Sequence, residues 1–303
     1  MDYAGLRLDQ ALSRLLPEYS RNRLQEWIRG GHVTVDGQAA TTKSKVWGGE
    51  SLLVRPQAAP GDIVHGAEDI PLEIVFEDEE ILVVDKPAGL VVHPGSGNWS
   101  GTMLNALLQH APRLADIPRA GIVHRLDKDT TGLLVVAKTL QAQTDLVRQL
   151  QARTVSREYV AVVHGALQGD GKVDAPIGRH PTNRTTMAVV PTGKPATTHY
   201  AVRAGGASWT LLDCKLETGR THQIRVHLHS LGHPLIGDPV YTTNRRYAGL
   251  PPQALDFPRQ ALHAARLALL HPQSARQMSW MSPLPDDIGA LIAALENSAL
   301  ENA

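Results

Sequence analysis

The sequence predicts an α+β fold divided into two domains. Its 303 residues are enough for one large core or for two smaller ones. Apolar residues follow helical spacing near the start of the chain, whereas short apolar runs typical of strands dominate the remainder. A stretch containing Pro, Gly and Ala at residues 58–70 separates these parts and is interpreted as a linker. We therefore expect domains at residues 1–57 and 71–290, followed by a C-terminal tail at 291–303.

The first domain is expected to contain two helices and two strands. Leu8 and Leu12 stand at helical spacing, and the helical pattern ends at Pro17. Ser20 is a suitable N-cap for a second helix, which ends after Arg29 at two consecutive glycines. The strands are expected at residues 32–37 and 51–54.

Four cations of this domain are candidate contacts to phosphate groups. Arg21 and Arg23 fall in the first turn of the second helix, where positive charge opposes the helix macrodipole. A phosphate partner is one reason for cations at such a position. Lys43 and Lys45 precede the second strand and complete the set.

The second domain is expected to combine strands with an amphipathic helix. Apolar runs predict strands at residues 71–76, 81–87, 155–165 and 209–216. Apolar residues at three- and four-residue spacings predict a helix at residues 139–153.

Residues 221–232 fit two patterns. Alternation favours a strand, but Ile224, Leu228 and Leu231 stand at helical spacing, with Thr221 as a possible N-cap, and we predict a helix. Pairs of histidines four positions apart on a helix can bind zinc. The carboxylate that accompanies such pairs in zinc proteases is missing, and we predict no metal. The histidines concerned are His222, His227, His229 and His233.

The stretch from His124 to Lys138 joins a polar loop to a buried strand. Its second half is continuously apolar, the pattern of a strand buried on both faces. Its first half brings Asp127 close to at least two cations, and such loops often carry catalytic groups. A structural alternative is that the Asp and Thr side chains only satisfy loop backbone groups.

The charges are balanced overall but unevenly distributed. The chain has 30 basic and 30 acidic residues, yet residues 57–80 hold eight acids and neither Lys nor Arg. Residues 81–303 hold 22 cations and 16 acids, a net charge of +6, which fits a nucleic-acid partner. Cys214 is the single cysteine, which excludes an intrachain disulfide framework. No apolar run reaches transmembrane length and no signal-peptide core is present, so we expect a cytoplasmic protein without membrane association.

The motif H-R-L-D-x-x-T-T-G-L-L-V at residues 124–135 resembles the signature of the RluA-type pseudouridine synthases. Similar matches are V-D-K-P-x-G-L-x-V-H-P-G at 84–95, L-E-T-G-R-T-H-Q-I-R-V-H at 216–227 and Q-A-L-H-A at 260–264. The N-terminal order of helices followed by G-H-V-x-V-D-G resembles an S4 RNA-binding domain. The resemblance implies a mixed, largely antiparallel sheet flanked by helices, preceded by a small S4-like α+β domain.

The same resemblance implies roles for individual residues. Asp127 is expected to be the catalytic carboxylate, with Arg225 as its cationic partner and Tyr159 as the aromatic residue of the pocket. Arg125 is expected to fill the stack that a flipped uridine leaves, and an ion pair with Asp129 is its structural alternative. The residues expected to bind RNA are Arg125, Arg21, Arg23, Lys43, Lys45, Arg220 and His222.

The expected activity is the isomerisation of uridine to pseudouridine in RNA. This reaction neither oxidises nor hydrolyses its substrate, so no cofactor is expected. The expected partner is large-subunit (23S) ribosomal RNA or its precursor, bound by a monomeric enzyme. The alternatives are a pseudouridine synthase acting on tRNA, a non-catalytic RNA-binding or ribosome-assembly factor, and a glycoside hydrolase using Asp127 with Asp129.

Overall fold

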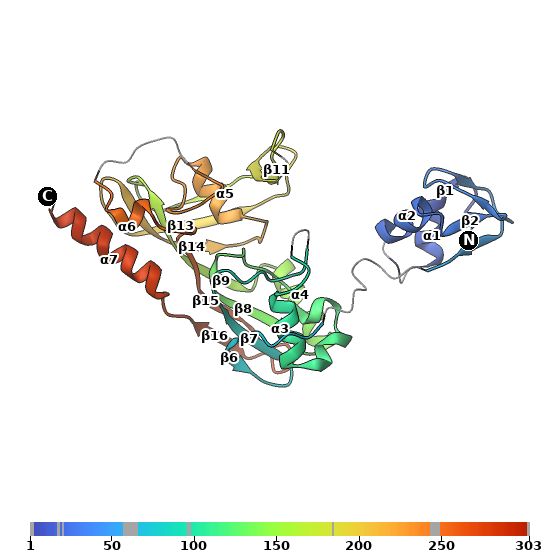
Figure 1. Cartoon of the computed structure of the whole chain (residues 1–303), viewed down its shortest axis with the longest axis horizontal. Helices are drawn as coiled ribbons and strands as arrows, with labels where there is room; N and C mark the ends of the chain where they lie inside the picture. Colours follow the sequence, from blue (N-terminus) through green and yellow to red (C-terminus); the bar gives the residue numbers. More distant parts are fainter. Residues whose placement is uncertain are drawn as a thin grey trace. The chain divides into compact units, whose positions relative to one another are not determined.

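The computed structural model describes residues 3–16, 19, 21–56, 66–95, 98–183, 185–242 and 249–301. Its contacts divide the chain into two compact units, Met1–His65 and Gly66–Ala303 (Figure 1). Most of the predicted linker and the predicted N-cap Ser20 lie outside the described residues. The two units are therefore described separately.

The first unit contains the two predicted helices. Helix α1 (Leu8–Leu15) and helix α2 (Arg21–Arg29) follow a short strand, β1 (Leu6–Arg7). Their apolar faces meet in a small core that includes Leu8, Leu24 and Trp27. The helical spacing seen in the sequence thus reports burial of one face of each helix.

Short strands complete the first unit. Strand β2 (Val33–Val35) pairs with β3 (Gln38–Ala39) and β5 (Leu52–Val54), while β4 (Lys45–Val46) pairs with β1. Asp36 and Gly37 connect β2 to β3 with positive φ angles of 50° and 80°, as a two-residue hairpin turn requires. Strands predicted at 32–37 and 51–54 are confirmed as β2 and β5.

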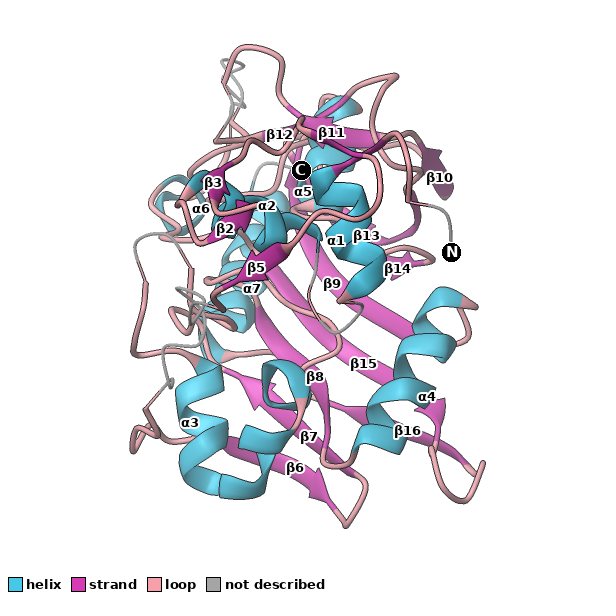
Figure 2. Ribbon diagram, turned by 90° about the vertical axis from the view of Figure 1, so that its right-hand side faces the viewer, coloured by secondary structure: helices cyan, strands magenta, loops and turns pink. Residues whose placement is uncertain are grey.

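A mixed sheet is the centre of the second unit. Among the described residues it has nine strands in the order β10-β13-β14-β9-β15-β8-β7-β6, with β16 pairing with β15 (Figure 2). The pairs are antiparallel except for β15 with β8, which confirms the predicted mixed, largely antiparallel sheet. The strands are β6 (Glu73–Glu77), β7 (Ile81–Lys86), β8 (Thr131–Ala137), β9 (Ser156–His164), β10 (Gly171–Asp174), β13 (Thr197–Gly205), β14 (Trp209–Leu216), β15 (Leu262–Leu270) and β16 (Gln277–Met281).

Helices cover both faces of this sheet. Helix α3 (Met103–His110) packs against Leu82 and Val84, whereas α4 (Leu140–Gln151) packs against Ile81 and Val83 of the same strand. Alternate residues of β7 therefore face opposite layers, which explains the continuous apolar run in its sequence. The two helices lie at opposite flanks of the strands in Figure 2. Helix α4 confirms the prediction for residues 139–153.

Three smaller elements lie near the end of the sheet that carries β13 and β14. Helix α5 (Gln223–Ser230) confirms the predicted helix, but its N-cap is His222 and the predicted N-cap Thr221 is wrong. Strands β11 (Ile177–Arg179) and β12 (Met187–Val189) form a separate hairpin, and its Ile177 packs against Val226 of α5. Helix α6 (Pro252–Leu255) is a single turn.

The predicted C-terminal tail at residues 291–303 is wrong. Helix α7 runs from Asp286 to Glu301, and Leu291 and Leu295 are fully buried against β9 and β14. The apolar residues recur at helical spacing and therefore belong to the core. None of the helices in the described part of the chain is long and apolar enough to cross a bilayer.

Candidate active site

The loop that carries Asp127 is fixed by its two threonines. The Thr130 N–H donates to the Asp127 carbonyl at 3.1 Å, which closes a turn. The Thr130 hydroxyl accepts a hydrogen bond from the Gln260 amide at 3.2 Å, and the Thr131 hydroxyl lies 2.9 Å from Nδ1 of His263. The hydroxyls of the T-T-G motif thus connect the loop to strand β15 and to Gln260, which precedes that strand.

Gly132 explains why the same motif needs a glycine. Its φ angle is +111°, and an added Cβ would lie 2.3 Å from the Ala264 carbonyl oxygen. Any larger residue would separate β8 from β15 at their parallel contact. The position of the Asp127 loop therefore depends on this close approach.

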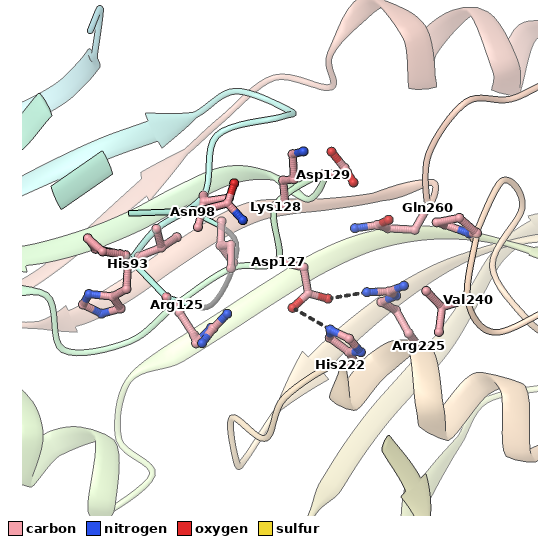
Figure 3. A pocket seen from close by; sticks show the side chains of 16 residues that line it. His93, Asn98, Arg125, Asp127, Lys128, Asp129, His222, Arg225, Val240 and Gln260 are labelled. Carbon is pink, nitrogen blue, oxygen red and sulfur yellow. Dashed lines mark hydrogen bonds and ion pairs between the residues drawn. The ribbon is translucent and has the colours of Figure 1, made fainter. Parts of the chain in front are cut away.

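Arg225 joins two carboxylates. Its Nη1 donates to Asp127 Oδ2 at 3.0 Å, while Nε and Nη2 donate to the two oxygens of Asp238 at 2.7 and 2.8 Å (Figure 3 shows the pair with Asp127). The Arg225 side chain is 5% exposed and that of Asp127 16%. Burial alone would lower the pKa of Arg225, but the hydrogen bonds and charges of Asp238 and Asp127 outweigh it and raise that pKa.

Backbone N–H groups hold the carboxylate of Asp238 in place. Its side chain is completely buried, and its Oδ1 also accepts the backbone N–H groups of Val240 and Tyr241 at 2.9 and 3.0 Å. The Arg225 guanidinium further lies 5.0 Å from the centre of the Tyr241 ring, a cation–π distance. These contacts leave Arg225 one orientation, which points Nη1 at Asp127.

His222 is the second group that faces Asp127. Its Nε2 lies 3.9 Å from Asp127 Oδ1, and its backbone has the left-handed φ of 57°. Its Nδ1 lies 2.8 Å from the Tyr241 hydroxyl, which itself accepts the Met187 N–H at 3.0 Å. The tyrosine can then donate to Nδ1, which leaves the proton of a neutral His222 on the nitrogen facing Asp127. Burial lowers the pKa of His222, although the charge of Asp127 raises it.

The Lys86 side chain binds the backbone of the loop that carries Asp127. Its side chain is fully buried, and its Nζ donates to the carbonyls of Pro87, Leu90 and Lys128 at 2.7, 3.0 and 2.8 Å. Burial lowers the pKa of Lys86 to about 8, although the charges of Asp129 and Asp127 partly oppose this shift.

Tyr159 lies in the core next to the loop. It belongs to the cluster that contains Leu126, and only 6% of it is exposed. Burial raises its pKa, Arg157 opposes this shift, and the negative charge of Asp127 adds to it. Its phenol is therefore neutral near pH 7.

A cavity of about 470 Å³ opens beside Asp127. Figure 3 shows Arg125 and His93 on one side and His222, Arg225 and Val240 on the other. The Asp127 carboxylate points toward Arg225 and His222, away from Asp129. The lining residues are Val91, Val92, His93, Pro94, Gly95, Asn98, Arg125, Leu126, Asp127, Lys128, Asp129, His222, Arg225, Pro239, Val240 and Gln260. This volume lies within the usual range for small-ligand sites, which is about 300–1,000 Å³.

Two of the expected RNA-binding residues of this unit lie at the cavity, and one does not. Arg125 is exposed, His222 is half-buried, and both line the cavity. Among the residues drawn in Figure 3, no ion pair joins Arg125 to Asp129, the structural alternative for this arginine. Arg220 is half-buried and does not line the cavity, and its Nε donates to the Pro195 carbonyl at 3.1 Å.

In the first unit, Arg21 has a structural partner. Its Nη2 lies 2.7 Å from Oδ2 of Asp9, whose side chain is completely buried. This ion pair accounts for a cation in the first turn of α2 without a phosphate. Lys43 and Lys45 are exposed, and Lys45 Nζ lies 5.7 Å from the centre of the exposed Trp47 ring. The side chain of Arg23 lies outside the described part of the chain.

The sequence analysis missed Asp238 and Tyr241. A signal was present, because Asp238 is the single acidic residue between positions 218 and 255, in a stretch rich in arginine and histidine. A lone carboxylate among cations is a candidate partner for a buried arginine.

The four histidines considered as zinc ligands make separate contacts. His227 hydrogen-bonds Thr198 and the Ala175 carbonyl, His229 the Thr242 carbonyl and His233 the His164 carbonyl. Across the described ranges, no group of three or more His, Cys, Asp or Glu residues is placed to hold a metal ion.

Two family matches identify the class of protein, an RNA-modifying enzyme with an N-terminal S4 unit. Residues 80–230 match the RNA pseudouridylate synthase family, and residues 6–51 match the S4 domain. The chain belongs to the RNA pseudouridylate synthase family, and its activity is that of an RNA pseudouridine synthase.

Relatives and solved structures agree with this assignment. The ribosomal large subunit pseudouridine synthase D of Nitrosomonas europaea is 63% identical over 294 residues, which cover 97% of this chain and 86% of that protein. The protein of the same name from Pseudomonas aeruginosa is 54% identical, with 97% and 93% covered. The structure of human RNA pseudouridylate synthase domain containing 4 is 26% identical, covers 74% of this chain and 93% of its own, and superposes with a TM-score of 0.59.

Proposed function

We propose that this chain converts uridine to pseudouridine in large-subunit (23S) ribosomal RNA or its precursor, with Asp127 as the reacting carboxylate. The observation that carries the proposal is the ion pair of Asp127 with the buried Arg225 beside a cavity of nucleotide size. The names of the relatives that are 63% and 54% identical support the choice of RNA.

The reaction exchanges one bond of C1′ for another. The bond from C1′ to N1 of uracil breaks, C5 bonds to C1′, C5 loses a proton and N1 gains one. Uridine and pseudouridine are isomers, so the balance needs neither a redox partner nor water. The chemistry instead requires an anionic group beside a ribose that develops positive charge, and a cavity that retains the detached uracil.

The charges around Asp127 suit this requirement. Asp127 and Asp238 contribute two negative charges and Arg225 one positive charge, so the trio has a formal net charge of −1. Arg225 places a positive charge 3.0 Å from the Asp127 carboxylate inside a partly closed site. Since Asp238 already occupies two of its donors, Arg225 does not cancel the negative charge that faces the cavity.

Two further residues are proposed to handle the extruded nucleotide. Extrusion of a base costs a few kcal/mol, and a side chain that fills the vacated stack lowers this cost. Arg125 is exposed at the cavity and is proposed for that role. The ring of Tyr159 is proposed to stack on uracil, and its neutral hydroxyl to assist removal of the C5 proton.

The proposal also covers the residues that bind RNA, the oligomeric state, the cellular location and the need for cofactors. Lys43 and Lys45 are proposed to bind RNA phosphates, with Arg23, Arg220 and His222 as further contacts. Arg21 is proposed to act mainly through its ion pair with Asp9. We propose that the enzyme acts as a monomer in the cytoplasm and needs neither a metal nor an organic cofactor.

The test is release of tritium from RNA that carries 5-tritiated uridine. Wild-type protein is expected to release tritium from large-subunit ribosomal RNA in preference to small-subunit ribosomal RNA or tRNA. Asp127→Asn should abolish release while RNA binding persists, since the substitution keeps the shape of the side chain and removes its charge. Preferential release from tRNA would move the substrate assignment to tRNA, and undiminished release by Asp127→Asn would remove Asp127 from the reaction.

A further inference from the structure

A second buried cation holds the Asp127 loop, and it comes from the region just before strand β15. Nη1 of Arg259 donates to the Asp129 carbonyl oxygen at 3.0 Å. Arg259 is 6% exposed, so water competes little for this contact. Lys86 binds the carbonyl of the neighbouring residue, Lys128, at 2.8 Å. Two consecutive carbonyls that follow Asp127 are therefore each bound by a cation.

Arg259 in turn depends on the C-terminal helix. Its Nε and Nη2 donate to the two carboxylate oxygens of Asp287 at 2.7 and 2.8 Å, a bidentate pair. Asp287 stands in the first turn of α7. The next turns of that helix bury Ile288, Leu291 and Leu295 against the sheet, which fixes the position of the carboxylate.

These contacts form one chain from α7 to the reacting carboxylate. The core fixes α7, Asp287 fixes the guanidinium of Arg259, and Arg259 fixes the carbonyl of Asp129. Asp129 lies inside the turn that the Thr130 N–H closes on the Asp127 carbonyl. A displacement of this turn would move the Asp127 carboxylate relative to Arg225, which approaches from the separate helix α5.

We propose that Asp287 and Arg259 are positioning residues for Asp127, and that α7 is thereby part of the catalytic apparatus. The proposal rests on the proposed role of Asp127. Neither residue lines the cavity, so their contribution should belong to the rate of the chemical step and not to RNA affinity. A misplacement of about 1 Å at a reacting group can cost on the order of a hundredfold in rate.

The test compares Asp287→Asn with Asp213→Asn. Asp213 also accepts a bidentate pair from an arginine, Arg203, and its side chain is 48% exposed against 40% for Asp287. Both substitutions remove one negative charge from a bidentate pair, so their effects on long-range attraction of RNA should be alike. The Arg259 side chain is 7% exposed and that of Arg203 46%, so Asp287→Asn is expected to lower the thermal midpoint more than Asp213→Asn does. The control pair lies on the neighbouring strands β13 and β14, whereas the Asp127 loop precedes β8.

The readouts are the single-turnover rate of tritium release at saturating enzyme, the dissociation constant for the same RNA, and the thermal midpoint. At a temperature well below both midpoints, Asp287→Asn is expected to lower the rate roughly tenfold to a hundredfold, with a dissociation constant close to that of Asp213→Asn. Asp287→Glu, which keeps the carboxylate, should restore a rate nearer to wild type.

Three outcomes would overturn the proposal. These are equal rates for Asp287→Asn and Asp213→Asn, a rate defect that disappears at temperatures well below the thermal midpoint, and a defect confined to RNA affinity. The same assay with Asp127→Asn tests the underlying assignment separately. An active Asp127→Asn protein would refute the role of Asp127 whatever Asp287→Asn does, whereas an inactive one beside an unaffected Asp287→Asn protein would refute only the positioning role.

Discussion

The guanidinium of Arg225 is shared unequally between its two carboxylates, with two hydrogen bonds to Asp238 and one to Asp127. Asp238 thus acts as the anchor of the arginine, while Asp127 receives the donor that remains. The same side chain therefore serves both the stability of the fold and the charge of the site, and substitutions can separate these two contributions.

Replacing Arg225 should remove turnover and also destabilise the fold. Arg225→Met leaves Asp238 buried with backbone donors alone, and removal of one partner of a buried ion pair costs about 3–5 kcal/mol. The double variant Arg225→Met/Asp238→Asn should recover much of that stability without recovering turnover. Denaturant unfolding and tritium release measure the two effects, and turnover by the double variant would show that Arg225 is dispensable for the reaction.

Substitutions at Tyr159 should separate its ring from its hydroxyl. Tyr159→Phe keeps the ring and should bind RNA as wild type does, while tritium release slows because the group that assists proton removal from C5 is absent. Tyr159→Ala should in addition weaken binding, since stacking of a base on an aromatic ring contributes about 1–3 kcal/mol. Direct binding and tritium release distinguish the two variants. A Phe variant with the wild-type rate would assign the residue to stacking alone.

Lys86 should give the enzyme an alkaline limit. Its pKa in the folded protein is about 8, so the cation that binds the Lys128 carbonyl is present below pH 8 and is neutralised above it. Tritium release should therefore decline above about pH 8 in wild type, and Lys86→Met should lack this limb while reacting more slowly throughout. A limb of the same pKa in Lys86→Met would assign it to another group.

The titration of Lys86 should lower turnover above about pH 8 but raise the free energy of unfolding. The unfolded chain holds the Lys86 proton up to its ordinary pKa of 10.5, whereas the folded chain releases it near 8. Between these values the unfolded state binds more protons, so the contribution of this group to the free energy of unfolding increases with pH. Denaturant unfolding at several pH values should thus show wild type gaining stability relative to Lys86→Met across that window.

The cations of the first unit should fall into two groups. Arg21→Ala should destabilise that unit, because the buried Asp9 carboxylate loses a donor at 2.7 Å. Lys43→Ala/Lys45→Ala should leave the fold intact, since both side chains are exposed. The slope of the logarithm of the RNA binding constant against the logarithm of salt concentration should instead become shallower in the double variant. The change is about 0.7–0.9 for each phosphate that the variant no longer neutralises. An unchanged salt dependence would mean that these lysines do not bind RNA phosphates.

Sequence patterns predicted the elements with strong local signals. The strand at residues 209–216 matches β14 at both ends, because its apolar run coincides with burial. Strand β15 was not predicted, since Leu262–Leu270 combines apolar residues with an arginine and shows neither period clearly. The predicted tail was wrong because the burial of Leu291 and Leu295 depends on strands far away in sequence.

Prediction of the site had the same limit. The motifs led to Asp127 and Arg225, and the structure places these side chains 3.0 Å apart. They did not lead to Asp238 or Asp287, because both act on an arginine through tertiary contacts. The lone acid among cations marked Asp238 as a candidate, whereas no such signal marked Asp287. The contacts of Arg21 were unpredictable for a similar reason, since its partner Asp9 lies on the preceding helix.

The parallel contact of β8 with β15 also has a consequence for the order of folding. Thr131 and His263, which meet there, are 132 positions apart in the chain. Pairings of such long sequence separation form late, after nearer contacts have reduced the entropy of closing the loop. A ribosome synthesising this enzyme must therefore extrude His263 before this contact of the Asp127 loop can form, and a nascent chain that ends before His263 lacks it.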